Sequence, residues 1–371
     1  MHIAKKERLA SLDILRGFDL FLLVFFQPVF LAFARHWSDS PVVSFFLNQF
    51  DHAHWIGFTA WDLVMPLFLF MVGAAMPFAL GRYRQLPEKR TVYKKITRRF
   101  VILFLLGVVV QGNLLSFDPL QIRIYTNTLQ AIAVGYFFSA LMLLHLSQKW
   151  QLIVTALLLV GYWALLTLFG DFTPEGNFAE QVDRAVLGRL RDGVWYSDGK
   201  WSFSEHYRYT WILSSTTFIV TTMMGVFAGQ IMRSGKDKLN NSKQLFIIGL
   251  LLLVAGWLLS FHTPVIKKIW SPSMTLWSGG WCFLLMALSY YVIDHKGWSK
   301  GLNWLKIYGM NSITAYTLGM VVNFRSVVHS LLWGLEQYTG GYYSAILTFG
   351  NFLILFFILR LMYKLRVFVK I

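Results

Sequence analysis

About ten stretches of mostly apolar residues, each near the length needed to cross a bilayer, constrain this sequence more than any other feature. A transmembrane helix needs about 20 such residues. Hydrophobic residues make up 56% of the chain and charged residues only 14%, which excludes a disordered chain, a disulfide scaffold and an ordinary soluble enzyme. We therefore predict an all-α, polytopic integral membrane protein with about ten transmembrane helices, forming one domain over residues 1–371. The predicted spans are approximately 18–34, 56–80, 100–117, 126–146, 151–169, 210–232, 245–261, 275–293, 308–327 and 343–363.

The 34 lysine and arginine residues are distributed unevenly between the connections. The basic connection over residues 81–99 belongs in the cytoplasm by the positive-inside rule. With about ten spans, both termini are then cytoplasmic, and residues 35–55 and 170–209 form extracytoplasmic loops. We expect a multi-pass membrane protein. The protein is expected to contact membrane lipid, and basic residues on its cytoplasmic side then account for most of the net charge of +16. We therefore expect no nucleic-acid partner.

The second predicted span carries the clearest candidate for chemistry. Asp62 lies about six residues into this span, where an ionisable group is costly and is a functional hypothesis by default. His52 and His54 precede the span, and a neutral imidazole can take a proton or attack an acyl group near neutral pH. The chain can fold back to place His52 beside Asp62. The two histidines could also bind a metal ion, but the sequence shows no matching third ligand, and we expect no metal. The plainer alternative is that these histidines lie at the membrane interface without a functional role.

Further polar residues occupy both ends of the predicted bundle. Gln27 lies midway along the first span and is followed by Pro28; an interhelical hydrogen bond and a functional role are equally consistent with it. On the cytoplasmic side, Arg98 and Arg99 lie just before the third span and Arg16 just before the first. They either serve only as the positive-inside signal or bind phosphate, whose oxygens match arginine forks.

Two motifs identify a family resemblance. The sequence SLDILRG from Ser11, followed by HAHWIGFTAWDLVMP from His52, resembles the membrane domain of heparan-alpha-glucosaminide N-acetyltransferase and its bacterial relatives of the DUF5009 type. Further matches, such as IYTNTLQAIAVGYF, TTMMGVFAGQIM and GMNSITAY, continue collinearly to about residue 316. The resemblance implies transfer of the acetyl group of cytosolic acetyl-coenzyme A to the amino group of a glucosamine-type sugar beyond the membrane. Relatives form dimers, which makes a homodimer an assembly to test.

The resemblance also implies roles for individual residues. The family's active-site histidine matches His52, which we expect to act as general base or acyl carrier. We expect Asp62 to orient His52, and Gln27, at a position where the family has asparagine, to donate a hydrogen bond to the oxyanion. The residues expected to bind acetyl-coenzyme A are Arg16, Arg98, Arg99, Gln130 and Asn311, and those expected to contact the acceptor are Trp55, His54 and Asn127.

Two other functions fit the same sequence. A transporter for an amino sugar or oligosaccharide would also place polar residues inside a helical bundle, although the sequence lacks the internal repeat common in transporters. An O-acetyltransferase of a cell-envelope glycan would share the donor and His52 but would use a hydroxyl acceptor. The segment SEHYRYTWILSS departs from the family pattern, so the acceptor can differ from glucosamine.

Overall fold

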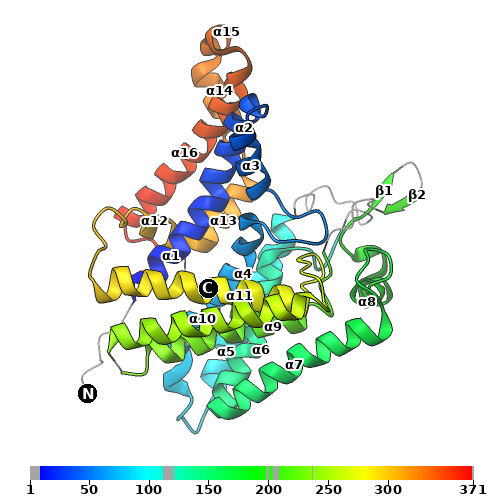
Figure 1. Ribbon diagram of the computed structural model, residues 1–371. Coiled ribbons are helices and arrows are strands. Elements are labelled where there is room, and N and C mark those ends of the chain that lie inside the picture. Colours follow the sequence, from blue (N-terminus) through cyan, green and yellow to red (C-terminus); the bar gives the residue numbers. More distant parts are fainter. Residues whose placement is uncertain are drawn as a thin grey trace.

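Helices make up nearly all of the regular structure in this computed structural model, which describes residues 9–111, 120, 122–197, 200–203, 209–235 and 237–369 (Figure 1). A two-stranded antiparallel hairpin, β1 (Val194–Ser197) and β2 (Lys200–Phe203), lies within the predicted outer loop 170–209. The α-helices are α1 (Ala10–Phe21), α2 (Gln27–Ala34), α3 (Pro41–Gln49), α4 (Val64–Leu80), α5 (Arg90–Val110), α6 (Thr128–His145), α7 (Gln148–Phe169), α8 (Phe178–Leu187), α9 (Ser215–Met232), α10 (Lys238–Ser260), α11 (Pro272–Ser289), α12 (Leu305–Met310), α13 (Ser312–Val321), α14 (Arg325–Leu332), α15 (Glu336–Thr339) and α16 (Tyr343–Lys364).

Eight helical segments in the described part of the chain are long and apolar enough to cross a membrane. They confirm the predicted all-α, multi-pass membrane fold. Of the other two predicted spans, one corresponds to α5, which begins among basic residues and whose predicted continuation to residue 117 lies outside the described residues. The other is divided at Asn311 into α12 and α13. The eight segments are Ala10–Trp37, Ala60–Tyr83, Thr128–His145, Gln148–Phe169, Ser215–Met232, Lys238–Ser260, Pro272–His295 and Arg325–Lys364.

The helices form a packed body and a projecting part. In the body, α4 contacts α6 and α9, α5 contacts α6, and α10 lies along α11. In the projecting part, α1 packs on α12, and α2 and α14 pack against α16, with α15 at the tip (Figure 1). A π-helical turn over Leu22–Phe26 separates α1 from α2 just before Pro28. The contacts of α4 with α1, α6, α9 and α11 place the helix that follows Asp62 at the centre of the protein.

Glycines allow the central helices to approach to backbone contact. A Cβ atom added to Gly225 of α9 would collide with the carbonyl of Phe70 in α4, and one added to Gly73 of α4 would collide with the carbonyl of Thr222. Gly17 of α1 meets α12 in the same way. Because lipid provides little hydrophobic drive between helices, such small residues let packing and dispersion hold a membrane bundle together.

Replacing Gly225 with valine is therefore expected to lower the thermal midpoint of the detergent-solubilised protein. The added side chain must push α4 from α9, and overpacking of this kind costs about 1–3 kcal/mol. Gly161→Val is the matched control, because a Cβ atom at that position of α7 meets nothing within 4 Å. Equal losses of thermal midpoint in the two variants would contradict the close crossing.

Candidate active site

Asp62 is fixed at the start of the central helix by its own local sequence. Thr59 adopts extended backbone geometry, and Ala60–Leu63 form a short 3-10 turn that leads into α4. One carboxylate oxygen of Asp62, Oδ2, accepts hydrogen bonds from the Thr59 backbone N–H at 3.0 Å and the Thr59 hydroxyl at 3.1 Å. This is the capping-box arrangement, in which an acidic side chain satisfies the free N–H of the residue preceding a helix. The Asp62 side chain is fully buried as a result.

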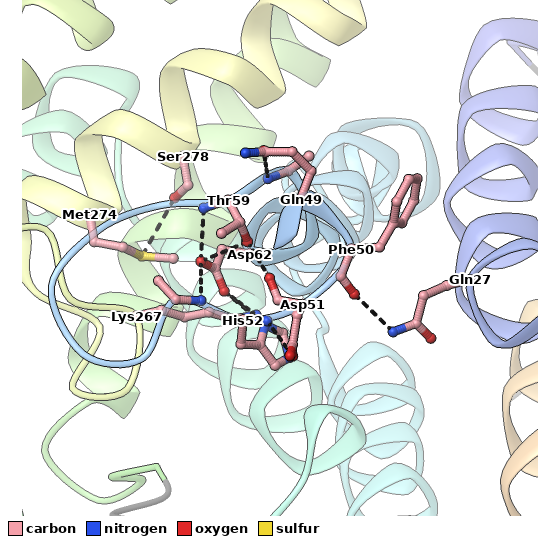
Figure 2. Close-up of polar contacts among 12 residues, drawn as sticks. Gln27, Gln49, Phe50, Asp51, His52, Thr59, Asp62, Lys267, Met274 and Ser278 are labelled. Atoms are coloured by element: carbon pink, nitrogen blue, oxygen red, sulfur yellow. Dashed lines mark hydrogen bonds and ion pairs between the residues drawn. The ribbon is translucent and has the colours of Figure 1, made fainter. Parts of the chain in front are cut away.

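The loop before this turn brings His52 onto the same carboxylate. His52 Nδ1 lies 2.8 Å from Asp62 Oδ1 (Figure 2). The Ala53 N–H donates to Asp62 Oδ2 at 3.3 Å. The His52 side chain keeps 38% of its surface exposed. Burial of the ring lowers the pKa of His52 below its ordinary value, against the opposing effect of the hydrogen bond to Asp62. A neutral imidazole oriented by a buried carboxylate can accept a proton at its other nitrogen.

Lys267 is the third member of the cluster, and sequence reasoning did not single it out. It lies between α10 and α11, with Nζ 3.1 Å from His52 Nδ1 and 3.4 Å from Asp62 Oδ1 (Figure 2). Its side chain is only 6% exposed. Burial lowers the pKa of Lys267 to about 8, opposed by the negative charge of Asp62. The available signal was a pair of lysines, Lys267 and Lys268, within the apolar stretch PVIKKIW just before a predicted span.

His52 and Lys267 face a cavity of about 200 Å³. Asn127, one of the expected acceptor contacts, also lines it, at the N-terminal end of α6. Most of the wall is apolar or aromatic, which excludes competing water from a small polar centre. The other lining residues are Leu23, Trp61, Val64, Met65, Phe68, Thr126, Thr128, Tyr209, Trp211, Tyr316 and Met320.

A second cavity, of about 60 Å³, lies against the same helices and is lined by Arg16 and Arg99. The two cavities share three wall residues, Phe68, Thr128 and Tyr316. The Arg99 guanidinium lies 4.4 Å from the centre of the Tyr136 ring, and its buried Nε has no hydrogen-bond partner among the described residues. Its neighbour Arg98 is exposed and lines neither cavity.

Two of the expected site residues instead hold the loop that carries His52. The Gln27 amide donates to the carbonyl of Phe50 at 3.1 Å (Figure 2), and the Trp55 indole N–H donates to the carbonyl of Phe172 at 2.7 Å. Neither residue lines the His52 cavity. The segment before His52 is therefore held by Gln27 of α2, and the segment after it is held by the contact of Trp55 with the predicted outer loop.

Other expected residues also have structural contacts. Gln130 belongs to the capping box of α6, where its side-chain amide oxygen accepts from the backbone N–H of Asn127 at 3.3 Å. The same oxygen also accepts from the Thr126 N–H at 2.8 Å. The Asn311 amide, at the break before α13, donates to the carbonyl of Val367 at 3.2 Å. His54 is exposed, and neither it nor Asn311 lines either cavity.

Asp183 is a further functional candidate that sequence reasoning did not select. From α8 its carboxylate accepts hydrogen bonds from the backbone N–H groups of Trp211, at 2.7 Å, and Ile212, at 2.9 Å. Burial raises the pKa of Asp183 to about 7. Because Trp211 lines the His52 cavity, Asp183 connects the outer segment to the cavity wall.

The fold and this cluster define a multi-pass helical membrane protein with a buried carboxylate, a histidine and a lysine at a cavity. Metal-binding groups of three or more histidine, cysteine, aspartate or glutamate residues do not occur within the described ranges. Residues 8–112 match the family described as a domain of unknown function, DUF5009. The chain is 27% identical over 369 residues to heparan-alpha-glucosaminide N-acetyltransferase of Homo sapiens and 26% identical over 365 residues to that of Mus musculus.

Each of these alignments covers 84% of this chain and 53% of the relative, so the chain spans about half the length of the curated relatives it matches. The chain is therefore similar, over 84% of its length, to the heparan-alpha-glucosaminide N-acetyltransferases. This confirms the resemblance predicted from the two N-terminal motifs.

Proposed function

We propose that this protein is a transmembrane acetyltransferase. It moves the acetyl group of cytosolic acetyl-coenzyme A to the amino group of a glucosamine-type sugar on the periplasmic side of a bacterial inner membrane, with both termini in the cytoplasm. The observation that carries the proposal is the contact of His52 with buried Asp62 at the wall of a cavity within the helical bundle. The similarity to curated N-acetyltransferases supports the same activity.

In the proposed reaction, His52 is the general base. Asp62 holds the hydrogen of the imidazole on Nδ1, which leaves the lone pair of Nε2 for the acceptor amine. The amine attacks the thioester carbonyl carbon and its proton passes to Nε2. The tetrahedral intermediate then collapses, the C–S bond breaks, and the leaving thiolate takes the proton from His52. A two-step route, in which Nε2 first takes the acetyl group and then gives it to the amine, uses the same residues.

The role of Gln27 changes in this proposal. Its amide donates to the carbonyl of Phe50, two residues before His52. We assign it the positioning of the histidine loop in place of the oxyanion contact expected from the sequence. Trp55 holds the other side of the same loop through Phe172.

The donor would approach from the side of Arg16 and Arg99. These residues line the smaller cavity, and arginine side chains bind phosphate oxygens through charge-assisted hydrogen bonds. The wall residues Phe68, Thr128 and Tyr316 separate this cavity from the one at His52. Displacing their side chains would open a continuous path along which the pantetheine arm reaches His52.

Arg99→Met is expected to raise the KM for acetyl-coenzyme A by about tenfold or more, because a hydrogen bond to a charged group contributes about 1.5–3 kcal/mol. Initial rates at varied acetyl-coenzyme A concentration measure the effect. Arg98→Met is the matched control, since this exposed neighbour lines neither cavity and its KM should stay at the wild-type value. A donor route past Arg99 is contradicted if the two variants have the same KM.

The function itself is tested in proteoliposomes that contain acetyl-labelled acetyl-coenzyme A on one side and glucosamine on the other. Label on the amino group of the sugar supports the proposal. Label on a hydroxyl group would identify an O-acetyltransferase, and unlabelled sugar crossing the bilayer without acetylation would identify a transporter. Either of these results would overturn the proposed N-acetyl transfer.

A further inference from the structure

Lys267 presents its amino group to the nitrogen of His52 that also faces Asp62. Nζ lies 3.1 Å from His52 Nδ1, and Nδ1 lies 2.8 Å from Asp62 Oδ1. Nδ1 of a neutral imidazole carries either a hydrogen or a lone pair, never both. It can therefore donate to the carboxylate or accept from the lysine, but it cannot do both at once. Nζ of Lys267 also lies 3.4 Å from Asp62 Oδ1, so the charge of the lysine bears directly on both groups.

An ammonium group has three donors and no acceptor. When Lys267 is charged, it bonds Nδ1 only if Nδ1 holds a lone pair, and the imidazole hydrogen is then on Nε2. In this form Nε2 cannot take a proton or an acetyl group. When Lys267 has lost its proton to solvent, the amine also offers a lone pair. The imidazole hydrogen then sits on Nδ1, donated toward Asp62, and the lone pair of Nε2 is free.

We propose that Lys267 is a positioning residue whose own proton selects the tautomer of His52. The charged lysine holds the form with hydrogen on Nε2, and the neutral lysine releases the form in which Nε2 can act as base or acyl acceptor. The selection of the tautomer stands on the geometry alone. Its consequence for acetyl transfer rests on the proposed function.

The surroundings of Lys267 allow both charge states. The groups that face its amino group are Asp62, His52 and the ring of Tyr209, whose centre is 6.0 Å away, while Asp51 acts on His52 from the loop. Burial lowers the pKa of Lys267 to about 8, so that the neutral amine gains population as the pH rises from 7.5 to 9. A titration in this range changes the population of reactive His52.

Diethyl pyrocarbonate measures this population without any acetyl donor, because it carbethoxylates a histidine nitrogen that carries an accessible lone pair. The rate at His52 is followed by peptide mass spectrometry in the full-length, detergent-solubilised protein and is divided by the rate at exposed His54 in the same sample. We expect the wild-type ratio to rise several-fold from pH 7.5 to pH 9, as the lysine loses its proton. Lys267→Arg, which stays charged, should keep a low ratio throughout.

Lys267→Met tests the opposite state. Methionine keeps a long side chain without the cation, so the ratio at pH 7.5 should already equal the wild-type value at pH 9. Lys268→Met is the matched control for removing a lysine from this loop and should follow the wild type. A wild-type rise that survives in Lys267→Arg, or that is still present in Lys267→Met, overturns the proposal.

The same variants in the acetyl-transfer assay should change kcat and its pH profile while the KM for acetyl-coenzyme A stays constant. The two proposals fail separately. Absence of acetyl transfer together with the expected carbethoxylation pattern refutes the proposed function and supports the role of Lys267. Acetyl transfer that requires His52, with carbethoxylation independent of Lys267, refutes the role of Lys267 alone.

Discussion

Replacing His52 with alanine is expected to lower kcat/KM for acetyl transfer by about 10²–10⁴-fold, the contribution typical of a general base. The protein should still fold, because the His52 side chain is 38% exposed and its loop is held independently by Gln27 and Trp55. Transfer of labelled acetyl to the sugar measures the loss, and the thermal midpoint confirms the fold. His54→Ala is the matched control, since this exposed histidine lines neither cavity and should leave kcat/KM unchanged.

The same variant separates the two routes through His52. An acyl carrier would exchange label between acetyl-coenzyme A and free coenzyme A without sugar, and His52→Ala would abolish this exchange. A general base would show no exchange in the wild type. Wild-type rates of sugar acetylation in His52→Ala would contradict both routes, because each requires a lone pair on this imidazole.

The sequence predicts most of the fold because the bilayer imposes simple rules on it. Apolar segments of sufficient length must become helices, since their backbone polar groups have no other partners in lipid. The His52–Asp62 contact was also predictable, because both groups lie within one short motif and the TAWD sequence is a capping box. Asn311 falls within the predicted span 308–327 and lies where that span breaks between α12 and α13.

Contacts between segments distant in sequence were not predictable. Lys267 reaches His52 across 215 residues, and only the packing of the loop before α11 on the start of α4 brings them together. The partners of amide side chains are equally hard to predict from the sequence, because a buried amide forms hydrogen bonds with whichever backbone group the tertiary structure places beside it. Gln27 could thus be recognised as an interior polar residue, whereas its partner Phe50 follows from how α2 and the loop pack.

Asp62→Asn is expected to reduce kcat by about 10³–10⁴-fold and also to destabilise the protein. The amide of asparagine no longer favours the tautomer with hydrogen on Nδ1, and comparable changes beside catalytic histidines have effects of this size. It also removes the negative charge 3.4 Å from the buried amino group of Lys267. Leaving a buried charge without its partner costs about 3–5 kcal/mol. Rates of acetyl transfer and thermal midpoints measure the two effects separately.

The double variant Asp62→Asn/Lys267→Met separates orientation from charge balance. With no cation left to compensate, its thermal midpoint should return toward that of the wild type, because neutral groups of similar volume avoid the desolvation cost of a buried ion pair. Acetyl transfer should not recover, since His52 still lacks the carboxylate that holds hydrogen on Nδ1 and stabilises the imidazolium formed during the reaction. Recovery of both stability and transfer in the double variant would show that Asp62 serves only to neutralise Lys267, and would remove it from the catalytic residues.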